Sequence, residues 1–194
     1  MTRLFTFVLA TTLLSLQGLA QDQQTASALY ESAKTGNKVA IEKITVMATG
    51  GDASAQFLLG LMYSRGEGVP KDAATVVTWY SKAAEQGYAD AQFSLGLMYA
   101  RGEGVPKDAA TAVTWYRKAA EQGDAKPQSN LGAMYAKGEG VPKDYVQAYM
   151  WRNLAAAQGD EIAKKGRDAL EPDMTREQIA EAQRLSREWK AKPK

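Results

Sequence analysis

The sequence predicts an all-α fold in which antiparallel helix hairpins stack into an α-solenoid with capping helices at its ends. The first observation is a repeat. The segment 66–72, Gly-Glu-Gly-Val-Pro-Lys-Asp, returns at 102–108 and again at 138–144, 36 residues later each time. The second observation is that apolar residues follow helical spacing on both sides of this segment, without the alternation typical of a β-strand. A single hairpin cannot bury its own apolar stripe, so we expect neighbouring repeats to stack.

Residues 1–20 have the composition of a signal peptide. Arg3 precedes a short apolar run at 4–16, and small residues stand before Gln21. The run is too short to span a bilayer, and a buried N-terminal helix is the alternative interpretation. We expect cleavage near Gln21, no membrane anchor on the cleaved chain, and a location in the periplasm or outside the cell.

The remaining chain divides into a repeat array with a cap at each end. Residues 21–51 are expected to form a degenerate N-terminal capping hairpin, which lacks the Gly-Glu-Gly-Val-Pro loop. The three 36-residue repeats are 52–87, 88–123 and 124–159. Residues 160–194 are expected to form C-terminal capping helices, in which Thr175 and Gln178 have the spacing of a capping box. Such caps shield the open ends of a solenoid core.

Each repeat contains two helices, A and B. In the first repeat we expect helix A from about 53 to 65 and helix B from about 73 to 86, because the Gly- and Pro-containing connection between them cannot continue a helix. Asp52 precedes helix A, and Asp124 holds the same place in the third repeat. We expect both carboxylates to cap the open amide groups of the helices that follow.

Two recurring residue types indicate how the helices pack. Glycine costs about 1 kcal/mol relative to alanine in a helix interior, yet it recurs within helix A at Gly60, Gly96 and Gly132. A close approach by helix B is the simplest benefit that offsets this cost. On helix B, large rings that are expected to fill the gap between repeats recur at Trp79, Trp115 and Trp151.

The composition excludes several kinds of chemistry. The chain has no cysteine and no histidine, which removes disulfides, thiolate nucleophiles, Ser-His-Asp catalysis and the usual zinc sites. Its 24 basic and 22 acidic residues give a net charge of +2. This near balance lacks the excess of basic residues that is typical of proteins that bind nucleic acid or an anionic membrane surface. We therefore expect no cofactor, no metal, no nucleic-acid partner and no enzymatic activity.

Two sets of repeated side chains could nevertheless carry chemistry. A carboxylate lies in each loop, at Glu67, Glu103 and Glu139. Equivalent positions of a solenoid lie on the order of 10 Å apart for each packed helix layer, too far for a retaining glycosidase pair and marginal for an inverting one, so a structural role in the loop is favoured. A ladder for stacking sugars is conceivable at Tyr63, Tyr99 and Tyr135, but core packing beside Met and Leu is favoured.

Three motifs carry a family resemblance. They are Ala-x-Ala-Gln-x-x-Leu-Gly-x-Met-Tyr, Gly-x-Gly-Val-x-x-Asp and Trp-Tyr-x-Lys-Ala-Ala-Glu-Gln-Gly, and they cover residues 52–159. Together they resemble the Sel-one-like repeat (SLR) family of the exported bacterial type, a relative of the tetratricopeptide repeats. The resemblance implies a right-handed α-solenoid that acts as a scaffold or adaptor for protein–protein contacts, and in some exported members as a regulator or host-interaction factor.

The chain departs from this family in two respects. Cysteine-rich relatives that are linked to binding of β-lactams or peptidoglycan fragments carry paired cysteines in each repeat. This chain has none, so that activity is not carried over. The third repeat also departs from the family pattern on its outer face, at Arg152, Asn153, Leu154 and Ala157.

We expect a partner to contact positions on helix A that vary among the repeats, because the identical positions serve packing. Residues at i, i+4, i+7 and i+11 form one stripe on a helix, and the A helices of related solenoids line the concave surface. The predicted groove consists of Ser54, Leu58, Leu61, Arg65, Asp90, Ser94, Leu97, Arg101, Lys126, Asn130, Ala133 and Lys137. Each stripe ends in a cation, which favours an acidic partner. The helix dipole explains the same cations without a ligand, and ordinary solvated surface explains the stripe.

The sequence therefore predicts a monomeric, non-catalytic, exported scaffold, adaptor or regulator that binds a protein or peptide segment in its concave groove. The alternative is a module that binds cell-wall (peptidoglycan) fragments, with weak hydrolytic activity.

Overall fold

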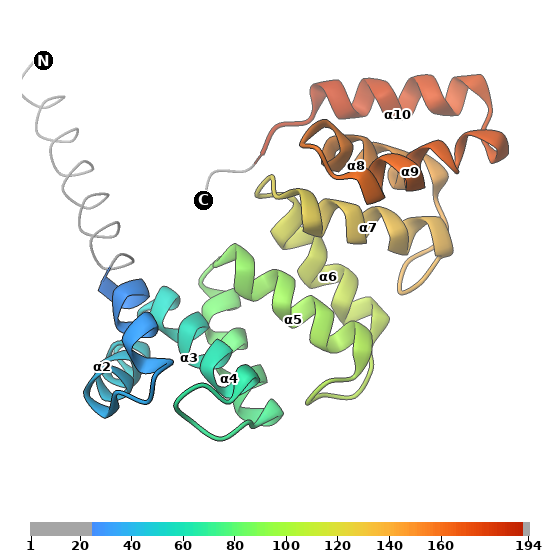
Figure 1. The fold of residues 1–194 in the computed structure, drawn as a ribbon. Coiled ribbons are helices and arrows are strands. Elements are labelled where there is room, and N and C mark those ends of the chain that lie inside the picture. The colour runs from blue at the N-terminus through green and yellow to red at the C-terminus, as the bar shows by residue number, and fades with distance from the viewer. Residues whose placement is uncertain (1–24, 192–194) are drawn as a thin grey trace, which may run out of the picture. The chain divides into compact units, whose positions relative to one another are not determined.

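The computed structural model describes residues 25–191, which consist of helices, turns and loops without any strand (Figure 1). This confirms the predicted all-α fold. The predicted signal peptide, 1–20, lies outside the described residues. The chain forms two compact units, which divide between Ala83 and Ala84.

The helices follow one another as antiparallel pairs. The first unit contains a helix at 25–33, α2 (Lys38–Thr49), α3 (Ala53–Arg65) and most of α4 (Ala73–Glu85). The second unit contains α5 (Ala89–Arg101), α6 (Ala109–Ala120), α7 (Ala125–Lys137), α8 (Tyr145–Ala157), α9 (Glu161–Asp168), the short 3₁₀ helix η1 (Glu171–Asp173) and α10 (Arg176–Glu188). The A helices of the three repeats are therefore α3, α5 and α7, and the B helices are α4, α6 and α8.

Aspartates begin several of these helices, as the sequence predicts, but not all of them. The Asp52 carboxylate accepts a hydrogen bond of 2.6 Å from the backbone N–H of Ala55, the third residue of α3. The equivalent Asp124 makes no side-chain cap on α7, so the expectation for this residue is wrong. The third residue of α7 is Pro127, which has no N–H to donate.

The recurring glycines lie where two helices approach closely. A Cβ on Gly60 would come within 2.6 Å of the Tyr80 ring, and one on Gly96 within 2.7 Å of the Tyr116 ring. In the third repeat, a Cβ on Gly132 would lie 2.7 Å from Cγ of Arg152. These contacts confirm the predicted close approach of helix B, and they show that the third repeat places a different side chain against its glycine.

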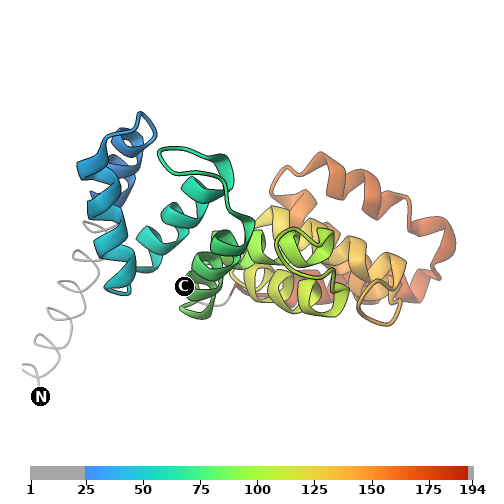
Figure 2. The same ribbon diagram turned by 90° about the horizontal axis from the view of Figure 1, so that it is seen from below.

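The repeated loops reach back onto the preceding helices. In the first unit, the loop between α3 and α4 extends toward the helix 25–33 and α2 (Figure 2). Its Gly68 lies against the carbonyl of Ala33 and the side chain of Ile41. In the second unit, Gly140 lies against the backbone of Ala109, at the start of α6. A glycine is required at both positions, because φ is +74° and +72° and because a Cβ would overlap the neighbouring chain.

Glutamines connect successive hairpins within the second unit. Gln92 and Gln128 are buried, and each donates from Nε2 to the backbone carbonyl eight residues earlier, at 3.0 and 3.2 Å. Their Oε1 atoms accept hydrogen bonds from Gln122 and Gln158, at 2.8 and 2.9 Å. These bonds satisfy buried polar atoms and fix the register of one hairpin on the next.

The C-terminal helices cover the last repeat. Thr175 and Gln178 form the predicted capping box at the start of α10. Trp189 contacts Trp151 edge to face, with 6.1 Å between the ring centroids, and Trp151 is buried. Trp79 and Trp115 are only half-buried and each lies beneath a lysine ammonium group. The expectation that these rings fill gaps is confirmed for Trp151, which α10 covers, and Trp79 packs against the core of the first unit.

Candidate functional site

Two neighbouring cavities lie on the A helices of the second unit. The larger has a volume of about 410 Å³ and is lined by Phe93, Lys126, Ser129, Asn130, Ala133, Arg152, Asp160 and Ile162. The smaller has a volume of about 310 Å³ and is lined by Ala89, Asp90, Phe93, Asp124, Ala125, Lys126 and Pro127. Phe93 and Lys126 are common to both, so the two cavities adjoin along α5 and α7.

The cavities bring together some of the predicted groove residues. Lys126, Asn130 and Ala133, from one stripe of α7, line the larger cavity. Asp90, from the stripe of α5, lines the smaller one. The other predicted groove residues of the second unit lie outside both cavities and are Ser94, Leu97, Arg101 and Lys137. Half of the predicted stripe in this unit thus faces a hollow.

The stripe of the first unit is less accessible than predicted. Ser54, in the first turn of α3, is only 7% exposed, in contrast to its exposed equivalents Asp90 and Lys126. Leu58 and Leu61 are half-buried and pack against the core of the first unit. Ser54 is therefore corrected from a groove residue to a buried one, and the two leucines have a packing role.

The cation at the end of each stripe lies beside the glutamate of its own loop. The N···O distance is 3.8 Å from Arg65 to Glu67, 3.6 Å from Arg101 to Glu103, and 3.8 Å from Lys137 to Glu139. Exposed pairs of this kind contribute about 0–1 kcal/mol. The cations therefore have intramolecular partners, in addition to the favourable helix dipole.

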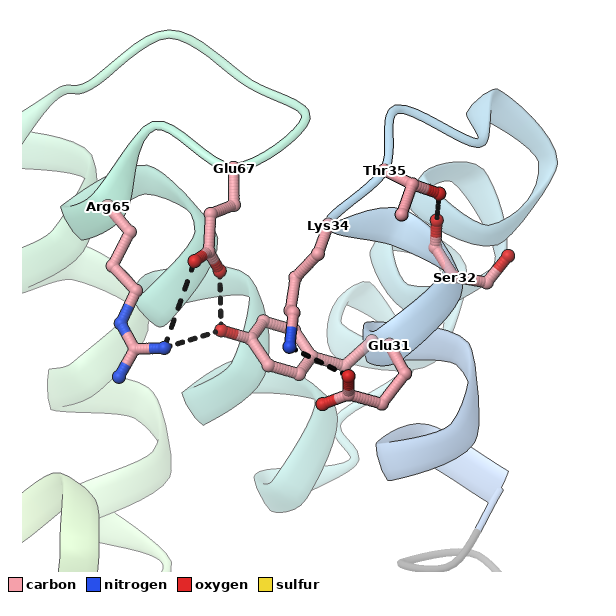
Figure 3. A network of polar contacts seen from close by, with 7 residues as sticks. Glu31, Ser32, Lys34, Thr35, Arg65 and Glu67 are labelled. Carbon is pink, nitrogen blue, oxygen red and sulfur yellow. Dashed lines mark hydrogen bonds and ion pairs between the residues drawn. The ribbon is translucent and has the colours of Figure 1, made fainter.

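In the first unit the loop carboxylate also holds the capping hairpin. Figure 3 shows the Arg65 and Glu67 side chains pointing toward one another beside the helix 25–33. The Tyr30 hydroxyl donates to Glu67 Oε2 at 2.6 Å, and Arg65 donates to the same hydroxyl at 3.1 Å. Burial, together with the hydrogen bond to Glu67, raises the pKa of Tyr30 to about 12. These contacts agree with a structural role of this loop glutamate.

Five residues of the larger cavity were not predicted: Phe93, Ser129, Arg152, Asp160 and Ile162. Arg152 is noticed in the sequence only as a departure from the family pattern. It is half-buried, and burial lowers the pKa of its guanidinium below the ordinary value, although arginine stays charged in proteins. Ile162 is 80% exposed at the start of α9. The missed signal is that Ser129 and Arg152 change together in the third repeat.

The site offers hydrogen bonding, charge and apolar contact, and no arrangement for metal chemistry. Within residues 25–191, no three acidic side chains gather in a way that could hold a metal ion. In the same part of the chain, no helix combines the length and the hydropathy needed to cross a bilayer.

The first unit has a further hollow of about 490 Å³ between helix 25–33 and α2, which includes the exposed side chains of Val39 and Val46.

Comparison with known families gives a match over most of the described array. The family model for the Sel1 repeat matches residues 53–88, 89–124 and 128–160. A search of curated proteins gives no match.

Solved structures of the same repeat type are similar to this chain. A Sel1 repeat protein from Oxalobacter formigenes is 39% identical with a TM-score of 0.70, over 76% of this chain and 60% of that one. A protective antigen of uropathogenic Escherichia coli with an SLR fold is 32% identical with a TM-score of 0.51, over 77% and 40%. The cysteine-rich protein B of Helicobacter pylori is 25% identical with a TM-score of 0.52, over 64% and 92%. The chain thus spans 60% or less of the first two proteins.

Proposed function

The chain belongs to the Sel1 repeat family, and on this premise we propose that it is a non-catalytic, exported scaffold that binds a protein or peptide segment along α5 and α7. Sel1 repeat proteins mediate protein–protein interactions, and the family is typically a non-enzymatic scaffold. The position of the binding surface, the export and the nature of the partner are the parts that we add.

The larger cavity is the observation that carries this proposal. It lies on α7 between α5, α8 and α9, and its lining combines apolar side chains with hydrogen-bonding and charged ones. Ligand sites in proteins have this combination, in which apolar surface supplies affinity and a few polar groups fix orientation. The adjoining smaller cavity extends the hollow toward the start of both A helices, which suits an extended segment better than a compact small molecule.

Export is supported by the sequence of residues 1–20, whose positive start, short apolar run and small residues before Gln21 are typical of a signal peptide. The chain's near-neutral charge also favours a protein partner over nucleic acid. We propose a monomeric protein in the periplasm or outside the cell, acting as an adaptor or regulator.

A peptide selection tests the binding surface. The purified chain is presented to a displayed library of short random peptides, and enriched peptides are measured by calorimetry. Ala133→Trp fills the larger cavity and is expected to weaken binding by at least tenfold. Thr114→Trp adds the same ring at an exposed position of α6 and is expected to leave the affinity unchanged.

Two outcomes would contradict the proposal. One is that no peptide is enriched, and the other is that Ala133→Trp binds the enriched peptides as tightly as Thr114→Trp does. A parallel incubation with purified peptidoglycan addresses the cell-wall alternative, because saturable retention or release of soluble fragments would favour that function instead.

A further inference from the structure

The first two repeats carry the same aromatic pair between helices A and B. Phe57 stacks on Tyr80 with 5.3 Å between ring centroids, and Phe93 contacts Tyr116 at 5.8 Å. The same two positions of the third repeat hold Ser129 and Arg152, 72 residues after Phe57 and Tyr80. Both replacements line the larger cavity. The third repeat has therefore exchanged a packed aromatic pair for a small hydroxyl and a guanidinium.

A third residue accommodates this exchange. Gly166 lies inside α9, where glycine is disfavoured, and a Cβ at this position would come within 2.8 Å of Arg152 Cζ. The Gly166 carbonyl accepts a hydrogen bond of 2.6 Å from Nη1 of Arg152. One edge of the guanidinium is thus anchored on α9, which holds the side chain in a defined place at the cavity.

The guanidinium has no counterion in the described part of the chain. Arg152 is half-buried, and none of the ion pairs among residues 25–191 includes it. Asp160 lines the same cavity, but its carboxylate caps α9 by accepting a 2.8 Å hydrogen bond from the N–H of Ala163. A charge that is partly removed from water is costly unless a partner of opposite charge meets it.

The two adjoining cavities differ in charge. The larger contains Arg152 and Lys126 against one carboxylate, Asp160. The smaller contains two carboxylates, Asp90 and Asp124, against Lys126. An anionic group is therefore favoured in the larger cavity and repelled from the smaller one.

We propose that the larger cavity is a carboxylate-binding site, in which Arg152 and Lys126 receive a carboxylate of the bound peptide while Phe93 and Ile162 contact its apolar neighbours. The carboxylate comes from an Asp or Glu side chain or from the C-terminus of the peptide. The planar fork of a guanidinium matches a carboxylate and binds it with two parallel hydrogen bonds. This inference rests on the proposed function and specifies the chemistry that the peptide must bring.

The peptides enriched in the selection described above provide the first test. Each is synthesised with a free and an amidated C-terminus, and with its Asp and Glu residues replaced by Asn and Gln. Loss of one carboxylate is expected to weaken binding by about tenfold or more, and the version affected identifies the source of that carboxylate. Unchanged affinity of every neutralised peptide would overturn the inference, although peptide binding itself would stand.

Variants at the guanidinium provide the second test. Arg152→Gln removes the charge and is expected to lower the affinity for the carboxylate peptide by the same factor, without further loss for its neutral version. Arg187→Gln removes an exposed arginine of α10 and serves as the matched control with wild-type affinity. The double variant Ser129→Phe with Arg152→Tyr restores the aromatic pair that the other repeats carry, so it should fold while losing the carboxylate preference. Equal affinity of Arg152→Gln and Arg187→Gln for the carboxylate peptide would contradict the proposal.

A small probe separates this inference from the proposed function. In a chain labelled with ¹⁵N, the Nε–H signal of Arg152 is expected to shift saturably with sodium acetate and to stay unchanged with acetamide. This readout does not depend on any selected peptide. If the selection fails and acetate still shifts the signal, the peptide-binding function is wrong and the carboxylate site remains. An Arg152 signal that responds equally to acetate and acetamide would refute the site.

Discussion

Gly140→Ala tests how the repeated loop is held on the preceding hairpin. Gly140 has a φ of +72°, and a Cβ built on it overlaps the carbonyl group of Ala109 and comes within 2.7 Å of the Ala110 nitrogen. The obstacle is backbone at the start of α6, which cannot turn away as a side chain could. The methyl group therefore either displaces the loop or disturbs the first turn of the helix.

The size of the effect follows from two separate contributions. A non-glycine residue in the left-handed region costs roughly 1–2 kcal/mol, and forcing an extra methyl group into a packed site typically costs about 1–3 kcal/mol. We expect Gly140→Ala to lower the free energy of unfolding by roughly 2–5 kcal/mol. Gly159→Ala is the matched control, because Gly159 has a φ of +89° and nothing lies within 4 Å of its built Cβ. It should lose only the first contribution, roughly 1–2 kcal/mol.

Urea unfolding followed by circular dichroism measures the difference between the two variants. If both have the same denaturant dependence, the shift in the midpoint reports stability directly. For a chain of this length, a difference of roughly 1–3 kcal/mol also corresponds to about 2–12 °C in the thermal midpoint. Equal stability of Gly140→Ala and Gly159→Ala would refute the reasoning, since the backbone strain alone would then account for the loss.

Two further predictions concern buried polar groups. Gln128→Leu should lower the free energy of unfolding by roughly 1–3 kcal/mol in the same urea assay. The reason is that the buried carbonyl of Ala120 and Nε2 of Gln158 each lose a hydrogen-bond partner. An unchanged urea midpoint would contradict this prediction. Burial raises the pKa of Tyr116 to about 12 from an ordinary value of 10.0. Between these two values the folded state keeps the hydroxyl proton, whereas the unfolded state releases it. The free energy of unfolding should therefore fall as the pH rises from about 10 to about 12. Tyr116→Phe should reduce this alkaline loss in unfolding experiments across that range, and an equal loss in the variant would contradict the assignment.

The helices were predictable because their signals are local and occur three times. The glycines inside helix A, the aspartates before the helices and the capping box at Thr175 each act through residues a few positions away. Where a local rule failed, another local residue was responsible, as with Pro127, which removes the donor that Asp124 would cap. The burial of Ser54 was not predictable from the repeats, because its equivalents Asp90 and Lys126 are exposed.

The candidate site was only half predictable for a related reason. Stripes on helix A identified Lys126, Asn130 and Ala133, but the other wall of the larger cavity comes from α8 and α9. α9 packs on α8, and Arg152 and Arg167 join the two helices through hydrogen bonds to the Gly166 carbonyl and to Asn153. The first two repeats hold tyrosines at the position of Arg152. A search for positions that vary on one helix cannot find a pair of residues that change together on two helices.

The paired change at Ser129 and Arg152 is not explained by attachment of the C-terminal cap alone. Holding α9 requires only that Arg152 reach the Gly166 carbonyl, which it does at 2.6 Å. A phenylalanine at position 129 would have been compatible with this, because an arginine guanidinium stacks favourably on an aromatic face. Serine gives up that contact and leaves open space beside the charged group. Among residues 25–191 no carboxylate pairs with the half-buried Arg152, and the open space beside it adds no contact within this part of the chain. The carboxylate of a bound peptide, as proposed above, would fill this space and meet the charge.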